Sequence, residues 1–126
     1  MTPFLLALMI WPFGGVKAAD FVGTYRCEGS SPSGKTYQAT LEIVQRPRFV
    51  LLRWGCSNSA YVLGVGMVRD DQLVVGNSTD GIGSLAIYDR QHDGIGGIWI
   101  IVGDDRIFTE TCTRGPLPVL TPPTSV

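Results

Sequence analysis

The side chains best suited to nucleophilic or metal chemistry are three cysteines and one histidine, namely Cys27, Cys56, Cys112 and His92. A thiol nucleophile needs a base beside it, and a zinc site needs four ligands, of which cysteines usually come as closely spaced pairs. The sequence has no Cys-x-x-Cys spacing, and His92 falls in an expected turn. We therefore expect no catalytic residue, no metal and no cofactor, and we interpret the protein as a non-enzyme.

The odd number of cysteines is most simply explained by one disulfide and one free thiol in an oxidising compartment. All three residues are candidates for the bond, so three pairings are possible. Cys27 with Cys112 is the natural pair if a closed meander places the first and last strands side by side. Cys27 with Cys56 stays open, because the sequence does not give the distances on which a disulfide depends.

The charged residues give weaker indications of a functional site. Acidic groups lie in expected loops, but their spacing matches no calcium-binding loop, and acidic turns are common. We weigh Glu110 as an inward-facing partner of Arg53 or Arg106, and we favour the alternative of a charge exposed on a strand. The net charge of −1 provides no basic patch for nucleic acid or an anionic membrane. The acidic groups are Asp70-Asp71, Asp80 and Asp104-Asp105.

Six aromatic residues are the candidates for a ligand site. If several of them face one mouth of a barrel, they would line an apolar pocket there. For Trp54 and Trp99 we favour the simpler interpretation, in which their rings fill the core. The six residues are Tyr25, Tyr37, Trp54, Tyr61, Tyr88 and Trp99.

Eight short apolar runs, several with the alternation typical of strands, must position these side chains. Asp93-Gly94 is the clearest hairpin turn, with Gly94 expected to supply a positive φ. The polar segment 77–81 is expected to be a loop. The runs are Phe21–Glu28, Tyr37–Gln45, Phe49–Trp54, Ala60–Val68, Gln72–Gly76, Ile82–Asp89, Ile95–Val102 and Ile107–Thr113.

Short turns between these runs indicate an all-β fold, a single antiparallel up-and-down meander over residues 19–114. Turns of this length join neighbours in sequence, which favours a meander over a Greek key. Eight strands is about the number that closes into a barrel whose interior holds side chains or one small ligand. An outer-membrane barrel is the competing interpretation, but the runs are short and lack paired aromatic girdles.

We interpret residues 1–18 as a signal peptide and residues 115–126 as a flexible, proline-rich tail. The uncharged apolar run Phe4–Phe13 is too short to span a bilayer and suits an export leader, although no basic residue precedes it. Small residues favour cleavage after Ala18, with Ala19 as the rival site. We therefore expect a periplasmic or secreted protein that does not enter the membrane after cleavage.

Several short motifs occur in a distinctive order: Gly23-Thr24-Tyr25, Pro32-Ser33-Gly34, Arg53-Trp54, Gly64-Val65-Gly66, Leu85-Ala86-Ile87-Tyr88, Gly97-Ile98-Trp99 and Glu110-Thr111. Over Phe21–Arg114 this pattern resembles small exported bacterial proteins often labelled fibronectin-binding protein. The Gly-Thr-Tyr and Gly-x-Trp strand signatures are also similar to those of avidin-like and metalloprotease-inhibitor barrels. The resemblance implies a barrel without a transferable catalytic set.

The expected function is that of a non-enzymatic binding protein. Its partner would be an extracellular or host protein, as the fibronectin-binding resemblance implies, or a small apolar ligand. The alternative is an inhibitor of a secreted hydrolase that acts through the exposed loop 30–35. The sequence does not fix the oligomeric state.

Overall fold

The computed structural model describes residues 15–56 and 61–116. The predicted apolar leader core, most of the predicted tail and part of the loop after Gly55 lie outside these residues. The elements are the 3₁₀ helix η2 (Ala18–Phe21) and the strands β2 (Gly23–Ser30), β3 (Thr36–Gln45), β4 (Val50–Gly55), β5 (Val62–Arg69), β6 (Gln72–Thr79), β7 (Ile82–Gln91), β8 (Gly94–Ile101) and β9 (Phe108–Arg114).

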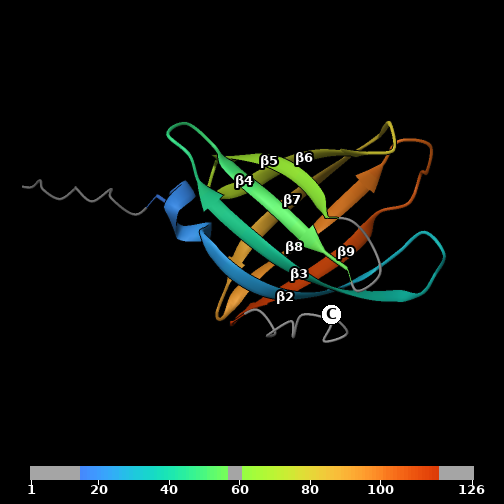
Figure 1. Ribbon diagram of the computed structural model, residues 1–126, viewed down its shortest axis with the longest axis horizontal. Helices are drawn as coiled ribbons and strands as arrows, with labels where there is room; N and C mark the ends of the chain where they lie inside the picture. The colour runs from blue at the N-terminus through green and yellow to red at the C-terminus, as the bar shows by residue number, and fades with distance from the viewer. Residues whose placement is uncertain (1–14, 57–60, 117–126) are drawn as a thin grey trace, which may run out of the picture.

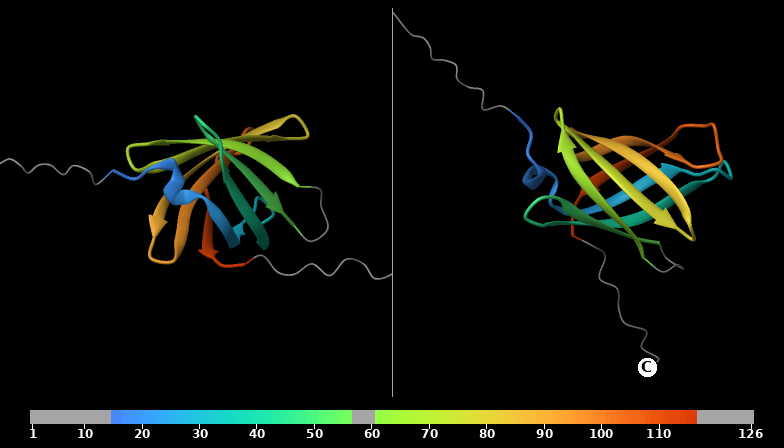
Figure 2. Two further views of the ribbon diagram at one scale, coloured as in Figure 1. Left: turned by 60° about the vertical axis from the view of Figure 1, so that its left-hand side comes forward. Right: turned by 90° about the horizontal axis from the view of Figure 1, so that it is seen from above.

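The eight strands form a closed barrel in which every strand pairs with its neighbours in sequence. β9 completes the circle by pairing antiparallel with β2. Figure 1 shows η2 at one end of this barrel, and the two views in Figure 2 show the sheet curling into a cylinder. The predicted all-β, eight-stranded antiparallel meander is confirmed. No helix among the described residues is long and apolar enough to cross a membrane.

The segment 77–81, predicted as a loop, is mostly strand. Asn77, Ser78 and Thr79 pair with Ser84, Gly83 and Ile82 of β7, so β6 runs to Thr79. The turn shrinks to Asp80-Gly81, which carries the positive φ values of 53° and 79° that a tight hairpin requires. The prediction was wrong because ladder hydrogen bonds come from the backbone, so a polar segment can extend a strand when its partner is long enough.

The hairpin at His92-Asp93 is confirmed, but the reason given for Gly94 was wrong. Gly94 is the first residue of β8 and has no positive φ. A Cβ at this position would lie 1.8 Å from the carbonyl oxygen of Cys112 on β9. The glycine is therefore needed because two backbones approach closely there, not because of the turn.

The half of the barrel next to η2 is filled with side chains. Its fully buried residues include Leu41, Ile43, Val50, Leu52, Leu73, Val75 and Ile95, together with Phe21 of η2 itself. The hydroxyl of Tyr25 donates to the carbonyl of Phe21 at 2.7 Å. Arg114 donates to the carbonyls of Asp20 and Val22 at 2.7 and 2.8 Å, and its guanidinium lies 4.9 Å from the centre of the Tyr25 ring. These contacts close this end of the barrel.

A disulfide links the first and last strands of the barrel. Cys27 of β2 and Cys112 of β9 are directly opposed in the register, and their sulfur atoms are bonded. This confirms the pairing expected from a closed meander. Cys56, just after β4, is a free and exposed thiol.

Candidate functional site: a cavity in the open half of the barrel

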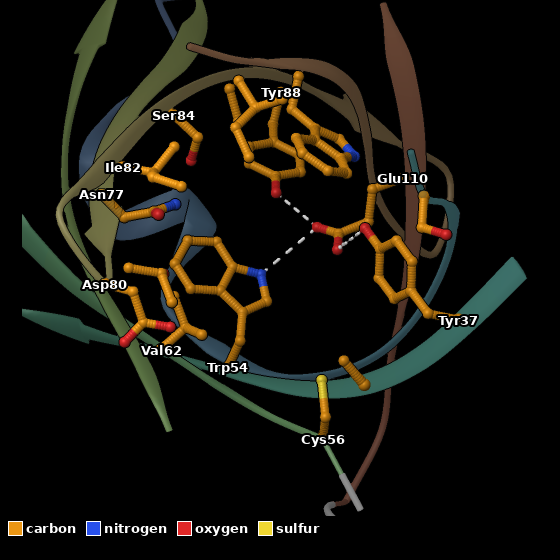
Figure 3. A pocket seen from close by; sticks show the side chains of 16 residues that line it. Tyr37, Trp54, Cys56, Val62, Asn77, Asp80, Ile82, Ser84, Tyr88 and Glu110 are labelled. Carbon is orange, nitrogen blue, oxygen red and sulfur yellow. Dashed lines mark hydrogen bonds between the residues drawn. The ribbon is translucent and has the colours of Figure 1, made fainter. Parts of the chain in front are cut away.

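The end of the barrel opposite η2 is hollow. A cavity of about 480 Å³ opens between the ends of β2, β4, β6 and β8 and the beginnings of the strands that follow them. This volume lies in the range of roughly 300–1,000 Å³ that is typical of small-molecule sites. Sixteen residues line it, and Figure 3 shows them. They are Ser31, Tyr37, Ala39, Trp54, Cys56, Val62, Asn77, Thr79, Asp80, Ile82, Ser84, Ala86, Tyr88, Trp99, Ile101 and Glu110.

A carboxyl group lies at the centre of the cavity wall. Glu110 of β9 is only 4% exposed and accepts three hydrogen bonds (Figure 3). The hydroxyl of Tyr37 donates to Oε2 at 2.6 Å, and the hydroxyl of Tyr88 donates to Oε1 at 2.5 Å. The indole Nε1 of Trp54 lies 3.4 Å from Oε1. Three donors converging on one carboxyl group satisfy the ionised, acceptor-only form of glutamate.

The prediction that Glu110 is exposed was therefore wrong, and so were the arginines weighed as its partners. Arg53 pairs on the outside of the barrel with Glu42, at 2.8 Å. Arg106 pairs with Asp104 at the mouth, at 2.6 Å. Phenols and an indole replace the expected cation because their hydrogen-bond donors remain attached to large apolar rings, which fit the interior of a small barrel.

Each of the three aromatic donors lies over a glycine of the neighbouring strand. A Cβ on Gly29 would come within 2.6 Å of the Tyr37 ring, one on Gly97 within 2.8 Å of the Tyr88 ring, and one on Gly64 within 2.9 Å of the Trp54 ring. These glycines leave the volume that the rings occupy.

Burial and the neighbouring carboxylate set the titration of the two phenols. Removal from water raises the pKa of Tyr88 and of Tyr37 far above the ordinary value of 10.0, and Glu110 raises both further. The indole of Trp99 lowers the pKa of Tyr37, although the Trp99 N–H makes no hydrogen bond to Tyr37 or to any other described group. Both phenols thus stay protonated and continue to donate to Glu110.

Four of the six aromatic candidates come together in this cavity. Tyr37, Trp54, Tyr88 and Trp99 line it, so the two tryptophans do more than fill the core. Tyr25 is buried at the opposite, closed end. Tyr61 is 53% exposed, and its ring lies 4.5 Å from the guanidinium of Arg53.

Among the described residues, one group could offer three ligands to a metal ion, but its two cysteines are bonded to each other. Cys27, Glu110 and Cys112 have potential ligand atoms within 4.8 Å of one another. Both sulfurs are used in the disulfide, so no thiolate is available for a metal. Cys56 lines the cavity mouth, where partial burial, and secondarily Glu110, raise the pKa of its thiol. A raised thiol pKa lowers the fraction of the nucleophilic thiolate.

Arg106 ties two loops together at the mouth of the cavity. Its guanidinium donates to Asp104 at 2.6 and 2.9 Å and to the carbonyl of Pro32, in the loop between β2 and β3, at 2.9 Å. The hydrogen bonds from Arg106 lower the pKa of Asp104 to about 2. The contact therefore holds across the physiological pH range, next to the cavity residue Ser31.

The outer surface of the barrel also has an unusual composition. Large apolar side chains point outward from β5, β7 and β8, and the register places Val65, Gly76, Leu85 and Ile100 in one continuous row. We call the outward-pointing apolar side chains of these three strands the outer apolar face. Its exposed members are Leu63, Val65, Met67, Leu85, Ile98 and Ile100, with exposed fractions of 42 to 65%.

Comparison with known proteins supports the fold only. No family model matches the chain, and no curated protein matches it in sequence. A redesigned β-barrel, mFAP1, solved bound to DFHBI, is 18% identical with a TM-score of 0.62 over 78% of this chain and 99% of that one. A de novo designed fluorescence-activating β-barrel is 23% identical with a TM-score of 0.59 over 79% of this chain and 99% of that one. At these identities the likeness shows a shared barrel fold and nothing about the ligand.

Proposed function

We propose that this protein is a non-enzymatic binding protein that takes a small, largely apolar molecule into the open half of its barrel. The observation that carries the proposal is the cavity of about 480 Å³, walled by aromatic rings around one satisfied carboxyl group. Apolar walls with a few fixed polar groups are the usual composition of a ligand site. A barrel closed at one end and hollow at the other holds such a molecule without any rearrangement of strands.

The positions of the reactive side chains support a role without catalysis. Cys56 is at the cavity mouth, whereas His92 is exposed in the turn between β7 and β8, at the closed end. A thiol whose pKa is raised and which has no imidazole beside it is a poor nucleophile. The disulfide suits an oxidising compartment, which agrees with a periplasmic or secreted location.

Titration with the neutral, environment-sensitive dye N-phenyl-1-naphthylamine tests ligand binding. We expect saturable fluorescence enhancement at one dye per chain, and loss of it in Ala86→Phe, which places a phenyl ring in the cavity. The double variant Leu63→Ser/Met67→Ser is the control, since it removes exposed apolar groups from the outer apolar face only. Enhancement that survives in Ala86→Phe and disappears in the control variant would assign dye binding to the outer surface and contradict the proposal.

A protein partner, as the fibronectin-binding resemblance implies, is the second candidate function. The outer apolar face favours it, because a contiguous exposed apolar patch is the usual mark of a protein-binding surface. Fibronectin is the partner to test, with immobilised fibronectin and the protein in solution. Binding that is lost in Leu63→Ser/Met67→Ser and kept in Ala86→Phe would support this candidate, and equal binding by all variants or none would count against it. Inhibition of a secreted hydrolase through the 30–35 loop stays a prediction.

A further inference from the structure

We infer that the cavity selects an organic ammonium ion, a protonated amine carried on an apolar body. This inference rests on the proposed function and specifies the charge of the ligand. It follows from three properties of the cavity wall: its charge, the direction of its hydrogen-bonding groups, and its aromatic faces.

The charge of the wall is negative. The lining includes two acidic residues, Glu110 and Asp80, and none of the lining residues is lysine, arginine or histidine. An anionic ligand would leave water to meet a carboxylate and no cation, which is strongly unfavourable in a poorly solvated site. A cation would gain an attractive field at the same place, because the low local dielectric strengthens it.

The hydrogen-bonding groups around Glu110 face the ligand mainly as acceptors. The hydroxyl protons of Tyr37 and Tyr88 are both directed at the carboxyl group. Each phenol oxygen therefore has only lone pairs left for a bound molecule. The carboxylate has about four acceptor positions, of which three are filled, so one stays free for a further donor. An ammonium N–H group supplies the donor that this arrangement lacks.

The aromatic faces provide the third contribution. Tyr37, Trp54, Tyr88 and Trp99 come from four different strands and line one space. A cation over an aromatic face is attracted by the quadrupole of the ring, and tryptophan gives the strongest interaction. The buried Nε1 of Trp99, which has no partner among the described residues, offers one hydrogen bond to an acceptor elsewhere on the ligand. A molecule with an apolar body, a cationic group and one acceptor atom would match the charge, the hydrogen-bonding groups and the aromatic rings of the wall.

Three probes with one skeleton test the inference on the unmodified protein: 3-phenylpropylamine, 3-phenylpropanol and 3-phenylpropanoate. Affinities come from calorimetry, with tryptophan fluorescence as a second readout. We expect the amine to bind at least about tenfold more tightly than the alcohol, and the acid to bind most weakly. Equal or tighter binding of the alcohol or the acid would overturn the inference and leave the proposed function standing. Failure of all three to bind at millimolar concentration would overturn both.

Glu110→Gln identifies the source of the preference. It keeps the size of the side chain and removes its charge, so the ratio of amine to alcohol affinity should fall to near one. Glu42→Gln is the matched control, because it removes one carboxylate from the outer surface, and it should leave the ratio unchanged. A ratio that survives in Glu110→Gln would contradict the assignment. If Glu110→Gln does not fold, the ranking of the three probes on the unmodified protein still decides.

Discussion

The hydroxyl of Tyr88 lies 2.5 Å from Oε1 of Glu110, between two strands that are not neighbours in the barrel. β8 separates β7 from β9, so this hydrogen bond crosses the interior above a third strand. Gly97 of β8 provides the space, since a Cβ there would come within 2.8 Å of the Tyr88 ring. The hydrogen bond at the polar centre of the cavity thus also links β7 to β9.

Removal of the hydrogen bond between Tyr88 and Glu110 should destabilise the barrel measurably. We expect Tyr88→Phe to lower the free energy of unfolding by about 1.5–3 kcal/mol, because it removes a hydrogen bond to a charged, buried acceptor. Urea denaturation followed by circular dichroism measures the change. Tyr61→Phe is the control, as that hydroxyl belongs to an exposed ring, and it should stay within about 0.5 kcal/mol of the original protein. Equal effects of the two variants would show that the interior hydrogen bond contributes nothing.

Alkaline pH should destabilise the protein through its tyrosines. The pKa of Tyr25, Tyr37 and Tyr88 in the folded state is raised above the ordinary value of 10.0. Their contribution is therefore fully present below pH 10 and is lost as pH rises above it, because the unfolded chain then releases protons that the folded chain retains. The expected slope is up to about 1.4 kcal/mol per pH unit for each phenol.

Denaturation in urea between pH 9 and pH 11.5 measures that slope. The double variant Tyr37→Phe/Tyr88→Phe lacks two of the three phenols and should show a clearly shallower decline. If the two proteins lose stability in parallel above pH 10, the interior phenols are not responsible for the decline.

Reduction of the disulfide should cost much more stability than loss of the free thiol. Cys27 and Cys112 are 85 residues apart, so their bond closes a long loop and strongly restricts the unfolded chain. We expect Cys27→Ala/Cys112→Ala to lower the free energy of unfolding by about 2–5 kcal/mol. Cys56→Ser should change it little, because Cys56 is exposed. An unchanged denaturation midpoint in the double variant would contradict a stabilising role for the bond.

Two glycines provide a matched test of how the cavity is built. A Cβ on Gly64 would lie 2.9 Å from the Trp54 ring and 3.0 Å from the carbonyl oxygen of Gly76, whereas a Cβ on Gly76 would meet nothing within 4 Å. Gly64→Ala should therefore destabilise the protein by about 1–3 kcal/mol and shift tryptophan fluorescence. Gly76→Ala should be neutral or stabilising by roughly 0.5 kcal/mol, since alanine has the lower conformational entropy in the unfolded chain. The same effect from both substitutions would rule out displacement of Trp54.

The fold could be predicted from the sequence because its determinants are local. Short apolar runs, several of them alternating, located all eight strands, and the turn residues between them implied a meander. Closure then made Cys27 and Cys112 neighbours. The length of β6 could not be predicted in this way, because the polar residues Asn77 to Thr79 are held by their partners on β7.

The site was only half predictable. Four of the aromatic residues were among the candidates, but no local pattern shows which rings share one end of a barrel. Glu110 was missed because a charged residue on a strand is usually exposed. An indication was present, since Glu110 alternates with Phe108 and Cys112 and so shares their inward face. The glycine beneath each ring, directly opposite it for Tyr37 and Tyr88 and two residues along the strand for Trp54, became meaningful only once the register was known.

The closed end beneath Phe21 has a kinetic consequence. A molecule bound above it enters and leaves by the same opening, beside the bridge from Arg106 to Pro32. Any change that affects only this opening lowers or raises one barrier for both directions of travel. Arg106→Ala should then accelerate association and dissociation by the same factor and leave the equilibrium affinity unaltered. The opening of the barrel would determine how long an occupant stays, while the wall around Glu110 would determine which occupant is held.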